Sequence, residues 1–219
     1  MPFVGCRSDG QTGPQEAPTG PDVSLPIGLK ASTELAYFAT YDIRVLAPRG
    51  WRCFGTSGSG GYSLYVSPEP INGASLRSEG WSGFAGPVIA IHHTFGGTSG
   101  RFEVARVIAR VFPAYKAFVT QVIDDGFGFT TSFPFGPYPK DALRYQSKSV
   151  VEYTTPPETE GLGTGPWLRK SGSPIEGVAI LTGDAPDLTL LSVRLPRALS
   201  EFAMVIIRQV ERDAPHFPG

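Results

Sequence analysis

The chain of 219 residues has only two cysteines, Cys6 and Cys53, and they form no CxxC pair. A structural zinc site built from thiolates is therefore excluded. Lysine is also scarce. Five of the 19 basic residues are Lys and the others are Arg. No run of roughly 18 or more apolar residues is present, so the sequence predicts no transmembrane helix.

Charge is low as well. Charged residues make up 18% of the chain, against about 25% in typical soluble domains. The net charge of −1 lacks the basic footprint of a nucleic-acid binder, so we expect no nucleic-acid partner. No metal-ligand spacing or cofactor fingerprint is present, and we expect neither a metal nor a cofactor. What the chain does contain is 27 Gly and 21 Pro, which argues against a helical bundle.

The N-terminal part has little that a core could bury. Residues 7–26 hold several glycines and prolines and almost no apolar side chain. Such a segment does not offset its ordering entropy by burial. We therefore predict a disordered tether over residues 1–30, followed by a single globular domain over residues 31–219.

The residues before Cys6 carry a resemblance. Phe3-Val4-Gly5-Cys6 resembles the end of a bacterial lipoprotein signal, although only five uncharged residues precede the cysteine. The resemblance implies lipidation of Cys6 and a domain anchored in the periplasm or cell envelope. Residues 46–68 and 97–113 also resemble segments of uncharacterised bacterial exported proteins, which implies no activity. Two alternatives remain: a disulfide with Cys53 in an oxidising compartment, or a cytoplasmic domain whose tail happens to contain a cysteine.

Hydrophobic periodicity predicts an α+β fold. Alternation and β-branched or aromatic content predict strands at 37–46, 51–54, 62–66, 87–94, 143–155, 177–182 and 188–195. A narrow polar stripe predicts a mostly buried helix over 101–112, and the ending 199–212 has the spacing of an amphipathic helix. We expect a mostly antiparallel or mixed sheet flanked by helices. This order is similar in topology to the extrinsic photosystem II protein fold, which implies no function.

The most specific local motif is a glycine-rich turn before the central helix. Gly97, Thr98, Ser99, Gly100 and Arg101 follow a strand and open the helix, where backbone N–H groups and an arginine are suited to an anion. Neither the P-loop nor the dinucleotide fingerprint is matched. The alternative is that Thr98 or Ser99 caps the helix and the glycines allow a tight turn.

The same turn provides an enzyme hypothesis. Ser99 lies at a strand-to-helix junction, where a nucleophile elbow places its serine, and Asp184 or Asp187 and then His216 follow along the chain. Arg101 stands where the elbow motif has glycine, and His216 lies in the C-terminal tail. The candidate catalytic residues are therefore Ser99, Asp187 and His216.

Two other features bear on function. His92 and His93 are adjacent on a strand, so their side chains should point to opposite faces and cannot chelate one ion together. The aromatic loop 127–138, which includes Phe129, Phe133 and Phe135, is either core cover or a binding surface.

The sequence therefore favours a non-catalytic exported domain that binds a cell-envelope protein or a small ligand and touches membrane only through a lipid anchor. The alternative is a small hydrolase or anion-binding enzyme that uses the 97–101 turn.

Overall fold

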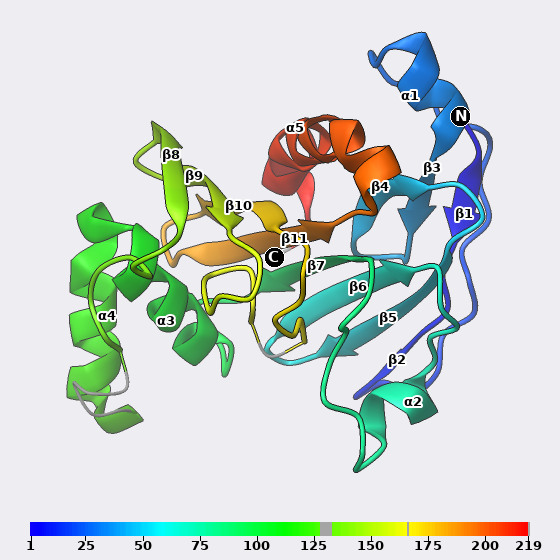
Figure 1. The fold of residues 1–219 in the computed structure, drawn as a ribbon. Coiled ribbons are helices and arrows are strands. Elements are labelled where there is room, and N and C mark those ends of the chain that lie inside the picture. Colours follow the sequence, from blue (N-terminus) through cyan, green and yellow to red (C-terminus); the bar gives the residue numbers. More distant parts are fainter. Residues whose placement is uncertain (128–132, 166, 219) are drawn as a thin grey trace.

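Two β-sheets organise the chain, and a computed structural model describes residues 1–127, 133–165 and 167–218 (Figure 1). The large sheet has eight strands in the order β2-β5-β6-β7-β11-β10-β9-β8, and the small sheet has the order β1-β3-β4. All neighbours are antiparallel except the two N-terminal strands, β1 and β2, which run parallel to β3 and β5. The predicted α+β class, with a mostly antiparallel sheet, is confirmed.

The strands of the large sheet are β2 (Ser8–Gly10), β5 (Arg52–Gly58), β6 (Gly61–Ser67), β7 (Val88–Thr94), β8 (Ala142–Ser147), β9 (Val150–Thr155), β10 (Ile175–Thr182) and β11 (Asp187–Arg194). Those of the small sheet are β1 (Phe3–Gly5), β3 (Leu35–Ala39) and β4 (Arg44–Pro48). The α-helices are α1 (Leu29–Glu34), α2 (Gly73–Arg77), α3 (Arg101–Val111), α4 (Lys116–Val122) and α5 (Ala203–Asp213). Short helical turns are η1 (Pro113–Tyr115), η2 (Ile123–Phe127), η4 (Arg197–Phe202) and η5 (Ala214–His216).

The central strands bury both of their faces because a layer covers each side (Figure 1). On β7, Ile89 and Ile91 point to the side of α5 and the small sheet, whereas Val88 and Ala90 point to the side of α3 and α4. This period of two follows from the strand geometry. The result is three layers with two hydrophobic cores, one on either side of the large sheet.

Both predicted helices are present, and each buries the apolar face that its sequence pattern indicates. In α3, six of the eleven residues are buried, which matches the narrow polar stripe in its sequence. The C-terminal helix α5 buries Ala203, Ile206, Ile207 and Val210 against the sheet. No described helix is long and apolar enough to cross a membrane.

Two predicted strands are hairpins, and the prediction of single strands was wrong. Residues 37–46 divide into β3 and β4 because the Thr40 hydroxyl accepts from the N–H groups of Asp42 and Ile43 and closes a turn. Residues 143–155 divide into β8 and β9, which pair antiparallel around a turn at Lys148 and Ser149. Polar turn residues inside an otherwise strand-like run were the overlooked signal.

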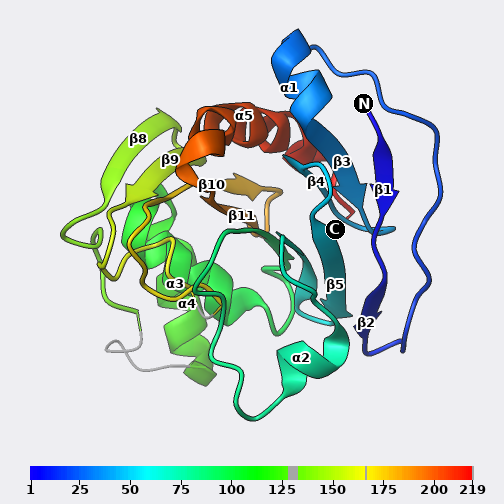
Figure 2. The same ribbon diagram turned by 45° about the vertical axis from the view of Figure 1, so that its right-hand side comes forward.

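The N-terminal segment is not the disordered tether that its composition predicts. Phe3–Gly5 pairs with β3 and Ser8–Gly10 pairs with β5, so the segment runs along both sheets (Figure 2). The amino group of Met1 also donates to the carbonyl of Val23 at 2.9 Å. Edge pairing supplies the backbone hydrogen bonds that a tether would leave to water, which is why low apolar content misled the prediction.

A disulfide fixes this segment. Cys6 and Cys53 are bonded, with their Cα atoms 5.5 Å apart, and Cys6 is 1% exposed within the core beside α5. The sulfur that a lipid anchor would need is therefore bonded to Cys53 in this structure. Of the three sequence alternatives for Cys6, the disulfide is the one that the structure contains.

Candidate functional site

The two adjacent histidines lie on opposite faces of the large sheet, as predicted. His93 contacts Thr189 at 2.9 Å and the ring of Phe217, which belongs to the core beneath α5. His92 lies on the other face, where its ring meets Tyr65 edge-on. The alternation of β7 therefore assigns His92 alone to the side of α3, where a cavity opens.

His92 is held as a neutral imidazole. Its Nδ1 lies 2.8 Å from the Ser63 hydroxyl on the neighbouring strand β6. Burial beneath protein atoms lowers the pKa of His92 to about 4. No hydrogen bond to a described residue involves its Nε2, so at neutral pH the ring keeps one nitrogen for a ligand, as donor or acceptor according to the tautomer.

The cavity at His92 has a volume of about 140 Å³. We call it the His92 cavity; its lining residues come from β7, α3, the loop before β10, and β11: His92, Thr94, Glu103, Gly163, Gly165, Trp167, Leu168, Leu188, Leu190 and Ser192. Most of this wall is apolar, with a few polar groups from His92, Thr94, Glu103 and Ser192. An apolar cavity of roughly 150 Å³ accepts a benzene-sized ring.

One wall depends on an aromatic cluster. Trp167 stacks on Trp81 with ring centroids 5.2 Å apart, and its edge approaches Tyr65 at 6.2 Å. Trp81 in turn meets Phe84 edge-on. The cluster holds the Trp167 side chain at the cavity without a regular element of secondary structure around it.

A buried arginine ties this wall to the sheet. Arg194, at the end of β11, is 1% exposed and donates to the carbonyls of Phe84, Gly86 and Arg169. Burial lowers the pKa of its guanidinium. Because these carbonyls come from two loops, Arg194 keeps the loop around Trp167 next to residues 84–86.

Asp141 fixes the remaining loop. Its carboxylate accepts from the Thr155 hydroxyl at 2.8 Å and from the N–H of Leu162 at 2.7 Å. The Thr155 hydroxyl also accepts from the N–H of Gly163. A Cβ at Gly163 would lie 2.7 Å from the Ile175 side chain, so glycine is needed for this close approach.

The neutral state of His92 predicts a pH dependence of stability. The unfolded imidazole titrates near pH 6.5, whereas the folded one resists protonation until about pH 4. The unfolded chain therefore binds the proton first, and the free energy of unfolding falls as pH falls through this window, by about 3 kcal/mol from His92. The buried His93 has a lowered pKa from the same cause and adds to the fall.

Urea denaturation at a series of pH values measures this. His92→Gln should flatten the fall, because an amide retains a partner for Ser63 but does not take up the proton. His216→Gln, at an exposed histidine, is the matched control for removing an imidazole. Equal pH slopes for the wild type and His92→Gln would contradict a neutral, partly buried His92.

The Gly97–Arg101 turn is closed on itself. Arg101 donates through Nε to the carbonyl of Thr98 at 2.9 Å and through Nη2 to that of Gly97, and a further nitrogen lies 3.9 Å from Asp125. The Thr98 hydroxyl accepts from the N–H of Gly100, which is the residue that precedes α3. These contacts favour the tight-turn alternative over an anion site, but Gly100 is the N-cap of α3 and makes no side-chain cap hydrogen bond, so the predicted capping by Thr98 or Ser99 is wrong.

The proposed hydrolase residues are not brought together. The Ser99 hydroxyl lies 3.3 Å from that of Ser59, and Asp187 accepts from the N–H of Gly96. His216 is exposed in η5, and among the described residues no hydrogen bond joins it to Ser99 or Asp187. The chain order of the three residues matched a triad, but their geometry does not.

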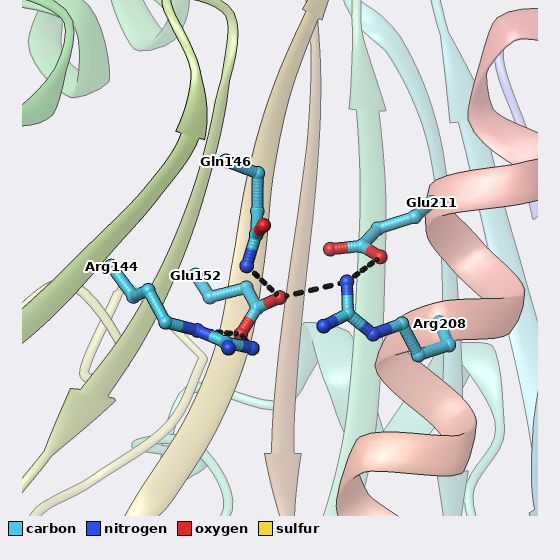
Figure 3. Close-up of polar contacts among 5 residues, drawn as sticks. All are labelled: Arg144, Gln146, Glu152, Arg208 and Glu211. Carbon is cyan, nitrogen blue, oxygen red and sulfur yellow. Dashed lines mark hydrogen bonds and ion pairs between the residues drawn. The ribbon is translucent and has the colours of Figure 1, made fainter.

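A second polar cluster lies on the opposite face, between the β8–β9 hairpin and α5 (Figure 3). The Glu152 carboxylate is 8% exposed and accepts from Arg144, from Gln146 at 2.8 Å and from Arg208 at 3.1 Å. Arg208 also pairs with Glu211 at 2.7 Å. With these partners the Glu152 carboxylate is satisfied, so the cluster acts to join the hairpin to the helix rather than to hold a ligand.

The Glu152 cluster predicts an effect on stability. Glu152→Gln removes the charge and turns an N–H group toward arginine donors, so we expect a loss of about 2 kcal/mol in the free energy of unfolding. Glu16→Gln is the matched control: Glu16 pairs with Arg7, but both side chains are largely exposed, and we expect less than about 0.5 kcal/mol there. If urea denaturation gave equal losses for the two substitutions, the Glu152 cluster would contribute no more to the free energy of unfolding than an exposed ion pair does.

The aromatic loop 127–138 is described only in part. Phe129 lies outside the described residues. Phe133 is buried in the core on the α3 side, and Phe135 is half-exposed beneath the Lys116 ammonium at 4.9 Å. Within the described part of the loop, Phe133 therefore serves as core cover, whereas Phe135 does not.

Comparisons with known proteins add no relative. No family model matches, and neither a curated protein nor a solved structure is significantly similar to the chain. Within the described residues, no group of three or more His, Cys, Asp or Glu side chains is placed to hold a metal ion.

Sequence reasoning placed His92 on one sheet face but missed the cavity beside it. Trp167 and Gly165 stood in a stretch that reads only as a loop, and Arg194 looked like an ordinary strand residue. A tryptophan within a glycine-rich loop was the available signal, since a large aromatic side chain in such a loop needs something to pack against.

Proposed function

We propose that the chain is a non-catalytic domain that binds a small molecule in the His92 cavity and works in an oxidising compartment outside the cytoplasm. The observation that carries the proposal is a mostly apolar cavity of about 140 Å³ into which a neutral histidine projects. Pockets with apolar walls and a few convergent polar groups are the usual form of small-molecule sites. The cavity supports a ligand over the alternative of a protein partner.

The size and lining suggest the kind of group that enters. The volume suits one planar ring, and Trp167, Leu188 and Leu190 offer apolar contact on its faces. The free nitrogen of His92 would hydrogen-bond a single polar substituent. Because the imidazole is neutral, the part of the ligand that reaches it is uncharged.

Binding rather than catalysis is favoured by the surroundings of His92. Ser63 and His92 form a serine–histidine pair, but among the described residues no carboxylate hydrogen-bonds the imidazole to orient it as a base. The Ser99 alternative lacks a base within hydrogen-bonding distance among the described residues.

The compartment is supported by the Cys6–Cys53 disulfide, because such bonds persist in exported proteins and are rare in the cytosol. A lipid on Cys6 and this disulfide would compete for the same sulfur. The proposal therefore includes export but not a lipid anchor on this residue.

Titration with phenol, followed by amide chemical shifts in NMR, tests the site. We expect saturable shifts at Thr94, Trp167 and Leu190 with a Kd on the order of 1 mM, as for a small fragment. Gly165→Leu should abolish them, since a Cβ at Gly165 meets nothing within 4 Å and a larger side chain would fill the cavity.

Gly97→Leu is the matched control, because a Cβ there is equally unhindered but lies outside the cavity. It should bind phenol as the wild type does. Absence of saturable shifts in the wild type, or equal binding by Gly165→Leu, would refute the proposal.

A further inference from the structure

A second cavity adjoins the His92 cavity along α3. Its volume is about 230 Å³, and it shares Glu103, Gly165 and Leu190 with the first. We call it the arginine cavity, because Arg106 and Arg110 line it together with Tyr138. Since three residues border both spaces, one ligand of modest length would extend from the first into the second.

Arg110 is the unusual residue of this cavity. Its guanidinium stacks on the Tyr138 ring at 4.2 Å and donates to the carbonyl of Gly136. Its Nε is buried and has no acceptor, and no ion pair within the described residues includes Arg110. A guanidinium has five N–H donors, so most of its hydrogen-bonding capacity is unused.

The charges around the cavity favour an anion. Arg106 is paired with Glu103 at 2.7 Å, so these two charges offset each other. Arg110 is left as an uncompensated positive charge in a partly buried place, where an unpaired group is costly. A carboxylate would satisfy it with the short, charge-assisted hydrogen bonds that arginine forms well.

The helix sets the length of the ligand. Glu103 borders both cavities, and the Cα of Arg110 follows seven residues later, about 10 Å along the axis of α3, a distance that the Arg110 side chain in the arginine cavity partly covers. A ring in the His92 cavity would therefore need a short linker to bring its carboxylate toward Arg110. Benzoate, in which the carboxylate is attached directly to the ring, is too short for this.

We propose that the two cavities form one site for a small arylalkyl carboxylate, with the ring beside His92 and the carboxylate against Arg110. This inference rests on the proposed function, because it requires that the His92 cavity binds the ring. Arg110 supplies the preference for a charged ligand, whereas the mostly apolar His92 cavity supplies the preference for the ring.

Calorimetric or NMR titration with 3-phenylpropanoate and with 3-phenylpropanamide tests this, since the two differ in charge but hardly in shape. We expect the carboxylate to bind at least tenfold more tightly, and benzoate to lose most of that advantage. The preference should weaken as salt is added, because it is electrostatic.

Arg110→Gln should bind the carboxylate and the amide with about equal affinity, because only the carboxylate loses its partner. Arg110→Lys should retain part of the preference for the carboxylate. Arg197→Gln, at an exposed arginine outside both cavities, is the matched control and should behave as the wild type. If Arg110→Gln does not fold, the comparison of carboxylate with amide in the wild type still decides.

The outcomes separate the two proposals. Equal binding of carboxylate and amide by the wild type, or a preference that survives in Arg110→Gln, overturns the role of Arg110 and leaves the His92 cavity as a ring site. Binding of neither compound, together with no phenol binding, overturns both.

Discussion

Reduction of the Cys6–Cys53 disulfide should lower the free energy of unfolding by about 4 kcal/mol. The bond closes a loop with a sequence separation of 47 residues, and the loss of chain entropy in the unfolded state for such a loop predicts this magnitude. The bond also holds the N-terminal segment against β3 and β5, so its pairing with both sheets should weaken. Urea denaturation with and without a reductant measures the effect.

The double substitution Cys6→Ser, Cys53→Ser is the control. Without reductant it should be less stable than the wild type by about the same amount, and a reductant should not change it further. The intact mass of the wild-type protein isolated from its native host should be lower than that of the reduced chain by two hydrogen atoms. Two free thiols in that protein would contradict the disulfide and remove the support for an oxidising compartment.

Replacing Arg194 should have an effect nearly as large. Arg194→Met removes donors to the buried carbonyls of Phe84, Gly86 and Arg169, and hydrogen bonds to a charged group contribute about 1.5–3 kcal/mol each. Because the substitution also removes the cost of burying a charge, we expect a net loss of about 3 kcal/mol. The loop that carries Trp167 should loosen, so phenol binding should weaken in parallel.

Arg197→Met, three residues further along the chain and exposed, is the matched control and should change stability by less than about 0.5 kcal/mol. Amide hydrogen exchange at Leu168 and Arg169 reports on the loop itself, because the Arg169 N–H donates to the carbonyl of Phe84. Unchanged stability and unchanged exchange in Arg194→Met would show that burying the charge costs as much as its hydrogen bonds contribute.

The elements that depend on local pattern were predicted well. The buried faces of α3 and α5 followed from periodicity, because a helix or strand repeats its own geometry along the chain. The opposite placement of His92 and His93 followed from the same rule. Errors arose where a polar turn interrupted a strand-like run, as at Thr40, since a hydrogen-bonded turn depends on one or two residues.

The candidate site depends on contacts that periodicity does not report. Gly165 and Trp167 meet β7 and β11 across a long sequence separation, and Arg110 faces Tyr138 from another segment. The turn 97–101 had the most suggestive local sequence, yet the Arg101 guanidinium donates to the carbonyls of Gly97 and Thr98 within the turn. The motif therefore located the start of α3 correctly, whereas its arginine is taken up by the turn itself.

For this protein, composition and periodicity alone establish the α+β class, the buried central helix and the amphipathic C-terminal helix, because these features arise from neighbours in the sequence. The long-range packing decides the rest. It pairs Cys6 with Cys53, orders the glycine-rich N-terminal segment, and places a neutral His92 and an Arg110 without an ion pair among the described residues beside adjoining cavities. Burial and charge compensation are properties of surroundings, and those surroundings are assembled only when distant segments meet.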